Sequence, residues 1–335
     1  MWAMVTDARI PVSLIIPAYC AQAHLADAIT SVTAQACVPA EIIVVDDASP
    51  DNTSEIAAAL GARVIRLAQN AGPAAARNAG VDAATLPWIA FLDADDVWLD
   101  GKLAAQWQAI SRWPDAGFCF TDYDAVYANG RVLPRETAAD PGYARMDAIE
   151  REGDAAFFTS NAMVRGLIDS MFVRQSSVIV NRELHQACGG YDVRWHLAED
   201  YDYFLRLSGI APAIAIERSL VSYRRRPGSL SADPLAEISA IDALWTSILA
   251  EPRGHAPLTL DLIRKRHPAI LRRGAVLALR LGRFRESAAF SRSLRAPLLL
   301  AAARLLDTPT GSAAFHAARS AWQRRPGRAP STALT

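Results

Sequence analysis

The sequence has few cysteines and no long apolar run. Its 335 residues include four cysteines, none in a CxxC pair, which predicts free, mostly buried thiols in a reducing compartment rather than a disulfide framework or a zinc site. The longest C-terminal apolar stretch, 296–303, falls far short of the roughly 18 residues that suggest a membrane span. The first apolar run is interrupted by Pro17 and is too short for a secretory signal. We therefore expect a cytoplasmic protein.

Net charge is also absent, because 35 basic and 35 acidic residues cancel, yet the two signs are unevenly distributed. Residues 253–335 hold 16 basic and three acidic side chains, which leaves 19 basic and 32 acidic side chains in the rest of the chain. The basic region is explained either by solvated helix faces or by peripheral contact with an anionic surface, such as the inner face of a membrane or an acidic lipid-linked ligand. No nucleic-acid-binding module is recognisable, so we expect no nucleic-acid partner.

Strand-like and helix-like segments alternate through the first third of the chain. Short β-branched apolar runs predict buried strands, and apolar residues at helical spacing predict helices between them. Strands are expected at 12–16, 41–45, 63–67 and 88–92, with helices at 24–36, at 73–84 and up to residue 60. This order predicts an α/β fold with a doubly wound, mostly parallel sheet, in which ligands bind at the carboxyl ends of the strands.

The rest of the chain is less regular. Its pattern predicts helices at 102–112 and 199–209 and strands at 117–121 and 173–181, whereas 127–161 gives no clear assignment. After residue 235 the chain is rich in Ala, Leu and Arg and is expected to be helical, with a helix–turn–helix pattern at 277–294.

Three carboxylates, Asp93, Asp95 and Asp96, directly follow the strand expected at 88–92. Burial and mutual repulsion would raise their pKa values. A hard cation such as Mg²⁺ or Mn²⁺ relieves that repulsion and bridges to phosphate groups. The alternative is structural, with Asp95 or Asp96 capping the helix that follows. Their position at a strand end in an alternating fold favours the metal.

Further charged residues lie where a ligand is expected, and each has a structural alternative. Asp46 and Asp47 end the second strand, where a carboxylate accepts hydrogen bonds from a base or ribose, or else starts an Asx-turn. Arg77 lies early in a helix, where its charge opposes the helix dipole, so it either has a counter-anion such as a phosphate or an Asp, or lies on the surface. Glu199 and Asp200 begin a helix, as dipole stabilisation alone would favour.

Taken together in chain order, these motifs resemble glycosyltransferase family 2, a large family of inverting enzymes. The matching segments are 17–19, 43–49, 70–78, 92–96, 189–192 and 199–200, within about residues 10 to 230. Each motif is weak, but their order and spacing are specific. The resemblance implies a GT-A fold, with a Rossmann-like nucleotide-binding half at 10–100 and an acceptor half at 101–235. A basic helical region at 236–323 and a disordered tail at 324–335 would follow.

The resemblance also implies an activity. A nucleotide-diphospho-sugar, with UDP the first expectation, would donate its sugar to a hydroxyl of a glycan or glycolipid acceptor in cell envelope polysaccharide biosynthesis. The implied cofactor is Mg²⁺ or Mn²⁺. A nucleotidyltransferase would show a glycine-rich loop after the first strand, and 17–22 contains no glycine. A nucleotidyltransferase, disfavoured in this way, and a non-catalytic nucleotide-sugar-binding protein are the alternatives.

Residue roles follow from the same resemblance. Asp200 would be the general base on the acceptor hydroxyl, with Glu199 beside it. Asp95 would hold the metal on the diphosphate, Asp93 would touch the ribose or the metal, and Arg77 would lie beside the nucleotide. The nucleoside pocket would be lined by Pro17, Ala18, Tyr19 and Asp47.

Two positions depart from the family pattern. Cys20 stands where the family often has Asn, and Arg226 stands where it commonly has His. An imidazole can ligate a metal, whereas a guanidinium cannot. We therefore expect Arg226 to neutralise the diphosphate directly.

Overall fold

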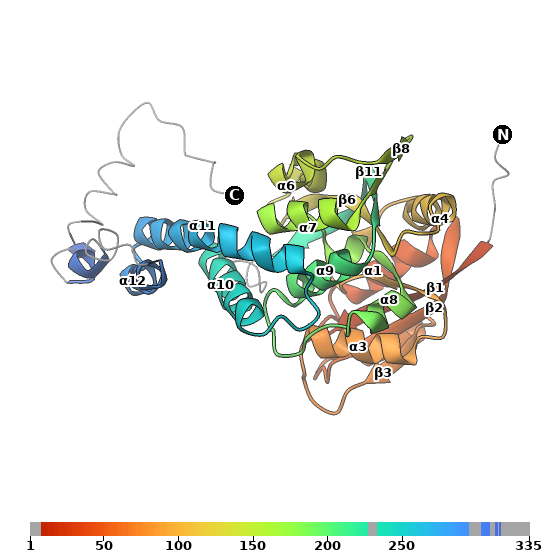
Figure 1. Cartoon of the computed structure of the whole chain (residues 1–335). Helices are drawn as coiled ribbons and strands as arrows, with labels where there is room; N and C mark the ends of the chain where they lie inside the picture. The colour runs from red at the N-terminus through yellow and green to blue at the C-terminus, as the bar shows by residue number, and fades with distance from the viewer. Residues whose placement is uncertain (1–7, 227–232, 295–302, 309–311, 314, 316–335) are drawn as a thin grey trace. The chain divides into compact units, whose positions relative to one another are not determined.

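The structure is a computed structural model that describes residues 8–226, 233–294, 303–308, 312–313 and 315 (Figure 1). The chain forms two compact units. The first comprises Met1–Ala232 and Thr246–Ile263, and the second comprises Asp233–Trp245 and Arg264–Thr335. The boundary expected at residue 235 stays a prediction, and the tail expected at 324–335 lies outside the described residues.

One mixed sheet forms the centre of the first unit. Its strands within the described residues are β1 (Ala8–Ala18), β2 (Cys37–Asp46), β3 (Arg63–Arg66), β4 (Trp88–Phe91), β5 (Val97–Trp98), β6 (Phe118–Tyr127), β7 (Val132–Leu133), β8 (Glu150–Glu152), β9 (Ala155–Phe158), β10 (Ile179–Asn181) and β11 (Ala213–Arg225). They run in the order β3-β2-β1-β4-β10-β6-β11-β9-β8, with β5 paired to β11 and β7 to β6.

The half of the sheet built from β1 to β4 is parallel, as predicted. Strands β3, β2, β1 and β4 pair in parallel, and so do β6 and β11. Strand β10 runs antiparallel to both β4 and β6 and joins the two parallel groups. The strand expected at 173–181 is shorter than predicted, because Gln175–Ser177 form a turn of 3₁₀ helix before β10 begins.

Helices cover both faces of the sheet. They are α1 (Leu25–Thr33), α2 (Thr53–Ala59), α3 (Pro73–Ala83), α4 (Lys102–Arg112), α5 (Glu136–Ala139), α6 (Pro141–Ala144), α7 (Ser160–Asp169), α8 (Arg182–Ala187) and α9 (Glu199–Ile210). Leu14 on β1 belongs to one buried cluster with Leu25 of α1 and Leu103 of α4. Ile15 points to the opposite face, where α3 approaches so closely that a Cβ on Gly80 would lie 2.4 Å from its side chain.

The second unit is helical. It contains parts of α10 (Pro234–Ala250) and α11 (Pro257–Leu281), together with α12 (Phe284–Ser293). Leu235, Leu271 and Phe290 belong to its buried core. The end of α11 at Leu281 and the start of α12 at Phe284 confirm the helix–turn–helix pattern predicted at 277–294. Within the described residues, no helix is both long and apolar enough to span a membrane.

Candidate active site

The carboxyl ends of β1 and β2 place the expected nucleoside-pocket residues together. Pro17 and Ala18 pair in register with Val45 and Asp46 on β2, and the backbone N–H of Asp47 donates to the carbonyl of Ala18 at 2.8 Å. Ala18 is buried. The Tyr19 side chain, in contrast, is 53% exposed at the strand end, so its ring is available to a ligand.

Two adjacent acids after β2 have different partners. Asp46 forms the local turn, because its Oδ1 accepts the Ser49 N–H at 2.8 Å and its Oδ2 accepts from Arg66 at 2.8 Å. Asp47 reaches the next loop, where its two oxygens accept the N–H groups of Ala71 and Gly72, each at 2.8 Å. Asp46 therefore has a local structural role before Pro50, although it accepts the N–H three residues on and not the N–H two residues on that an Asx-turn uses. The pocket role of Asp47 stays a prediction, and its carboxylate holds the start of α3.

The three acids after β4 surround the strand end, and their partners come from distant segments. Asp96 is buried, and it accepts the Ser176 hydroxyl at 2.5 Å and the Arg224 N–H at 3.0 Å. Burial, with the charges of Asp93 and Asp95, raises the pKa of Asp96, as the sequence predicted. Asp95 accepts a hydrogen bond from Arg226 Nε at 3.0 Å.

The helix-capping alternative for these acids is wrong. Helix α4 begins at Lys102, and its N-cap is Gly101, which has no side chain to accept a hydrogen bond. Asp95 and Asp96 therefore contact other groups and do not cap α4.

Arg77 connects this strand end to α9. Its Nη2 donates to Asp93 Oδ1 at 2.9 Å, and its Nη1 donates to Glu199 Oε1 at 3.0 Å across a separation of 122 residues. Arg77 is buried, so the surface alternative is wrong, and an Asp is its counter-anion together with a Glu. Its guanidinium also lies over the ring of Tyr191, 5.4 Å from the centroid.

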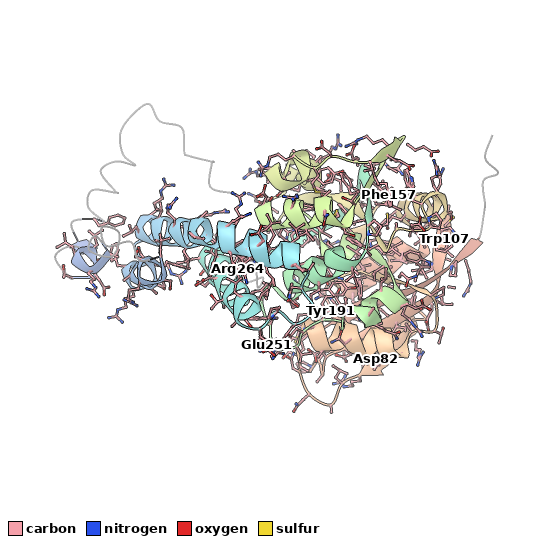
Figure 2. The ribbon with its side chains drawn as sticks, in the orientation of Figure 1. Asp82, Trp107, Phe157, Tyr191, Glu251 and Arg264 are labelled. Atoms are coloured by element: carbon pink, nitrogen blue, oxygen red, sulfur yellow. The ribbon has the colours of Figure 1, made fainter. Side chains whose placement is uncertain are left out.

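Tyr191 belongs to another of the sequence motifs, and the fold brings it onto α3. The side chain of Asn78 accepts the Tyr191 N–H at 2.9 Å and donates to its carbonyl at 2.8 Å. The Tyr191 ring packs edge-on against Phe91 of β4, with centroids 5.6 Å apart. It lies in the interior of the first unit (Figure 2). The motifs at 70–78 and 189–192 therefore form one structural element.

Glu199 and Asp200 stand at the first turn of α9. Burial, followed by the charge of Asp200, raises the pKa of Glu199 to about 7. Burial also raises the pKa of Asp200, although the charges of Arg77 and Arg174 oppose that shift. The preceding residue, Ala198, has a left-handed backbone with φ of 65°, a conformation that non-glycine residues rarely adopt. Such strain clusters at functional sites.

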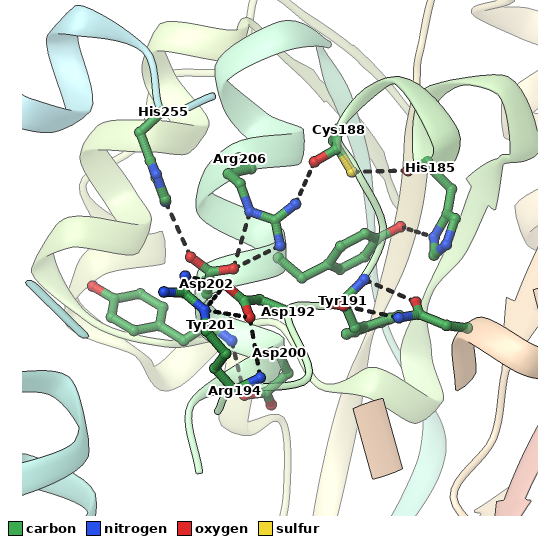
Figure 3. Close-up of polar contacts among 12 residues, drawn as sticks. His185, Cys188, Tyr191, Asp192, Arg194, Asp200, Tyr201, Asp202, Arg206 and His255 are labelled. Carbon is green, nitrogen blue, oxygen red and sulfur yellow. Dashed lines mark hydrogen bonds and ion pairs between the residues drawn. The ribbon is translucent and has the colours of Figure 1, made fainter. Parts of the chain in front are cut away.

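A network of polar side chains that the sequence did not predict stabilises α9 (Figure 3). Asp202 accepts from Arg206 Nε at 2.9 Å, one turn along the helix, and Arg206 also donates to the carbonyl of Cys188. His255 Nε2 lies 3.3 Å from Asp202 Oδ1 and comes from the segment 246–263. The i, i+4 spacing of Asp202 and Arg206 could have predicted their ion pair from the sequence. Nothing in the sequence indicated His255.

The site suits a divalent cation that is shared with a ligand. Among the described residues, no group of three or more His, Cys, Asp or Glu side chains is arranged to hold a metal by itself. Mg²⁺ usually takes one or two carboxylates together with substrate phosphates. Asp93 and Asp95 fit that pattern, because they are oxygen donors at one strand end whose present partners are guanidinium groups.

Solved structures identify the class of fold. S. aureus TarS 1–349 in complex with UDP-GlcNAc matches with a TM-score of 0.61 and 18% identity, over 93% of this chain and 92% of that one. The complex of the same protein with UDP gives a TM-score of 0.58 over the same shares of both chains. The fold is the predicted GT-A fold with additional C-terminal helices.

Sequence comparison then gives the family. The model for Glycosyl transferase family 2 matches residues 13–172. The succinoglycan biosynthesis protein ExoO of Rhizobium meliloti is 31% identical over 239 residues, 70% of this chain and 65% of that protein. The Escherichia coli UDP-Glc:alpha-D-GlcNAc-diphosphoundecaprenol beta-1,3-glucosyltransferase WfgD is 34% identical over 124 residues, 36% of this chain and 49% of that protein. Residues 13–172 therefore belong to glycosyltransferase family 2, and the chain spans about half to two thirds of the length of these relatives.

Proposed function

We propose that this protein is an inverting glycosyltransferase that moves a sugar from a nucleotide-diphospho-sugar, with UDP as the carrier, to a hydroxyl of a glycan or glycolipid. The observation that carries the proposal is the buried bridge made by Arg77. It ties Asp93, at the strand end where ligands bind in such sheets, to Glu199 at the start of the helix that carries Asp200. Arg77 would thereby hold the proposed donor site and the proposed base close together.

Asp200 is the proposed general base. Its side chain accepts one hydrogen bond, from the N–H of Tyr201 at 2.8 Å, and it is half-buried beside the cationic Arg77. Removing the acceptor proton lets the hydroxyl attack the anomeric carbon opposite the leaving diphosphate. One displacement inverts that carbon and requires no protein nucleophile. A positioned base contributes about 10²–10⁴-fold to such a step.

The remaining residues would bind the donor. Pro17, Ala18, Tyr19 and Asp47 would contact the nucleoside, and Asp93 and Asp95 would hold Mg²⁺ or Mn²⁺. When bound, the metal would act as a Lewis acid that stabilises the departing diphosphate. Arg226 now pairs with Asp95, so it is placed to exchange this carboxylate for a diphosphate oxygen.

The relatives support the choice of substrates. WfgD carries UDP-Glc and a diphosphoundecaprenol acceptor in its name, ExoO acts in succinoglycan biosynthesis, and TarS was solved with UDP-GlcNAc. We extend these to a UDP-sugar donor and an envelope polysaccharide acceptor here. The 16 basic residues in 253–335 support work in the cytoplasm with peripheral contact at the inner face of the membrane.

Substitution of the proposed base tests the function. A thermal-shift screen of nucleotide sugars with Mn²⁺ first selects the donor, and release of the free nucleoside diphosphate is then followed. We expect Asp200→Asn to lower turnover roughly 10²-fold or more while donor binding persists. Asp82→Asn, which changes an exposed carboxylate on α3, is the matched control (Figure 2). Near-normal turnover of Asp200→Asn would place the base elsewhere, and loss of turnover in Glu199→Gln alone would assign it to Glu199.

A further inference from the structure

Arg174 lies two residues before Ser176, which contacts the acidic end of β4, and its guanidinium is held by two tyrosines. Its Nε donates to the hydroxyl of Tyr123 on β6 at 3.1 Å. The guanidinium also lies over two aromatic rings, 5.5 Å from the centroid of Tyr123 and 5.4 Å from that of Tyr223 on β11. Tyr123 is buried, and the two rings pack edge to face at 5.9 Å. The side chain therefore has little rotational freedom to lose on binding a ligand.

This guanidinium differs from the others at the site. Arg77 pairs with Asp93 and Glu199, and Arg226 pairs with Asp95. Within the part of the chain that the structure describes, Arg174 forms no ion pair with a carboxylate, and Nε is the atom through which it donates. Its side chain is half-buried. The Nη groups of Arg174 form a planar fork of the kind that binds carboxylates and phosphates.

The charge of Arg174 acts on the base. Burial alone would lower the pKa of Arg174, but the side chains of Tyr123 and Tyr223 and the charge of Asp200 raise it, so the guanidinium stays cationic. In return, Arg174 lowers the pKa of Asp200. The segment is anchored on the other side by Ser176, whose hydroxyl accepts the N–H of Asp93 at 3.0 Å. The charge of Arg174 therefore acts on Asp200, and Ser176 ties the segment that carries Arg174 to the acidic end of β4.

We propose that Arg174 forms an oxyanion subsite, which takes a phosphate or carboxylate group carried by the acceptor and so places the attacking hydroxyl next to Asp200. The role of Asp200 in this proposal rests on the proposed function. The acceptor class it selects is anionic, such as a phosphorylated or carboxylate-bearing glycan. The donor diphosphate carries the same chemistry, so the test must separate the two sources.

Thermal unfolding of the full-length chain with inorganic phosphate as the probe tests the subsite. Phosphate bound to the folded state raises the unfolding midpoint in a concentration-dependent way. We expect the concentration for half of the effect to rise at least about tenfold in Arg174→Gln, because a charge-assisted bidentate contact is lost. Arg174→Lys keeps the positive charge but lacks the planar fork. Its half-effect concentration should therefore lie between those of the parent and Arg174→Gln. It also serves if the Gln variant does not fold.

Arg131→Gln is the matched control. Arg131 also lies over a tyrosine ring, 5.4 Å from the centroid of Tyr127, but it is exposed on the turn after β6. This control should respond to phosphate as the parent does, which separates a site from the general stabilisation that phosphate salts produce. An equal response of the parent, Arg131→Gln and both Arg174 variants would overturn the subsite.

Saturating UDP distinguishes the source of the anion. If the subsite belongs to the acceptor, UDP raises the midpoint on its own and leaves the phosphate response in place. If UDP abolishes the phosphate response, Arg174 serves the donor diphosphate and the acceptor assignment is wrong. Failure of UDP to stabilise the parent would contradict UDP as the carrier, whereas the comparison of the Arg174 and Arg131 variants would still decide whether an anion binds at Arg174.

Discussion

The acids at the end of β2 and those at the end of β4 look alike in sequence but serve different purposes. At β2, Asp46 is satisfied by Ser49 and Arg66 and Asp47 by backbone amides, so both carboxylates fix loops. At β4, Asp93 and Asp95 contact guanidinium groups, and an incoming cation can take the place of a guanidinium on each carboxylate. Backbone amides cannot be exchanged in this way. The partners of the acids therefore separate Asp93 and Asp95, which can exchange a side-chain partner for a cation, from Asp47, which is bound by backbone amides.

The largest expected difference between the two ends concerns their arginines. Arg77→Met would leave the buried Glu199 and the partly buried Asp93 without a cation, which should cost about 3–5 kcal/mol of unfolding free energy. Arg66→Met removes a half-exposed arginine from Asp46 and should cost about 1 kcal/mol or less. Urea unfolding of both variants measures the difference. Equal losses would contradict the distinction between the two ends.

Glu199, which Arg77 connects to the β4 end, and Asp46 at the β2 end should also respond to pH with opposite sign. The folded-state pKa of Glu199 is raised to about 7, so its contribution to stability is full below its unfolded pKa and is lost as the pH rises towards 7. We expect the parent to lose up to about 3 kcal/mol over that range, and Glu199→Gln to lose less.

At the β2 end, burial would raise the pKa of Asp46, but hydrogen bonds from Ser49 and Ser54 and the Arg66 charge lower it. Its contribution is therefore present above its unfolded pKa of about 3.9 and is lost on acidification. Urea unfolding of the parent, Glu199→Gln and Asp46→Asn at several pH values separates the two trends. A pH profile of Glu199→Gln identical to that of the parent would rule out the assignment to Glu199.

Substitution of one acid at each end should separate metal binding from loop structure. Asp47→Asn leaves one backbone N–H facing an amide donor, so we expect the unfolding free energy to fall by about 1–3 kcal/mol. The increase in UDP affinity on adding Mn²⁺ should be the same in this variant as in the parent. Asp95→Asn should stay close to the parent in stability and lose that Mn²⁺-dependent gain. Calorimetric titration of UDP with and without Mn²⁺ is the measurement. An unchanged gain in Asp95→Asn would exclude Asp95 as a metal ligand.

The smallest expected effect is a shift in the pH profile of turnover. Asp200 must be deprotonated to act as a base, and the charge of Arg174 lowers its pKa. Arg174→Gln should therefore move the acidic limb of the profile to higher pH, with about a two- to fivefold loss at acidic pH. Arg174→Lys should largely restore the limb. A purely structural role for Arg174 would lower turnover equally at every pH.

Local patterns predicted the parallel half of the fold because each strand there is an apolar, mostly β-branched run that alternates with a helix-like segment. β1, β2 and β4 end within two residues of the expected positions, and the clustered acids lie at the ends of β2 and β4. The acceptor half was harder, since β7, β8 and β9 contain only two to four residues each. Such short segments show no measurable alternation, and their strand identity comes from pairing: β7 pairs with β6, β9 with β11 and β8 with β9.

The candidate site divides in the same way. The acids of β4 and α9 were identifiable, because each lies at the end of an element. The bridge formed by Arg77 could not be predicted, because its partner Glu199 lies 122 residues away in the sequence. The position of Arg77 early in a helix predicted only that it has some counter-anion. Arg174 had no local signal at all. Its environment is built by tyrosines from two different strands, and only the tertiary fold brings them together.

The contact between His255 and Asp202 has a consequence for any shortened form of this protein. A chain cut after residue 232 would keep the whole sheet and α9 but would lose His255, and Ala256, which packs within about 3.1 Å of where a Cβ on Gly209 would stand. The C-terminal end of α9 would then be exposed to water, about two turns from the proposed base Asp200. Residues up to 263 are part of the catalytic scaffold, and a minimal enzyme has to include them.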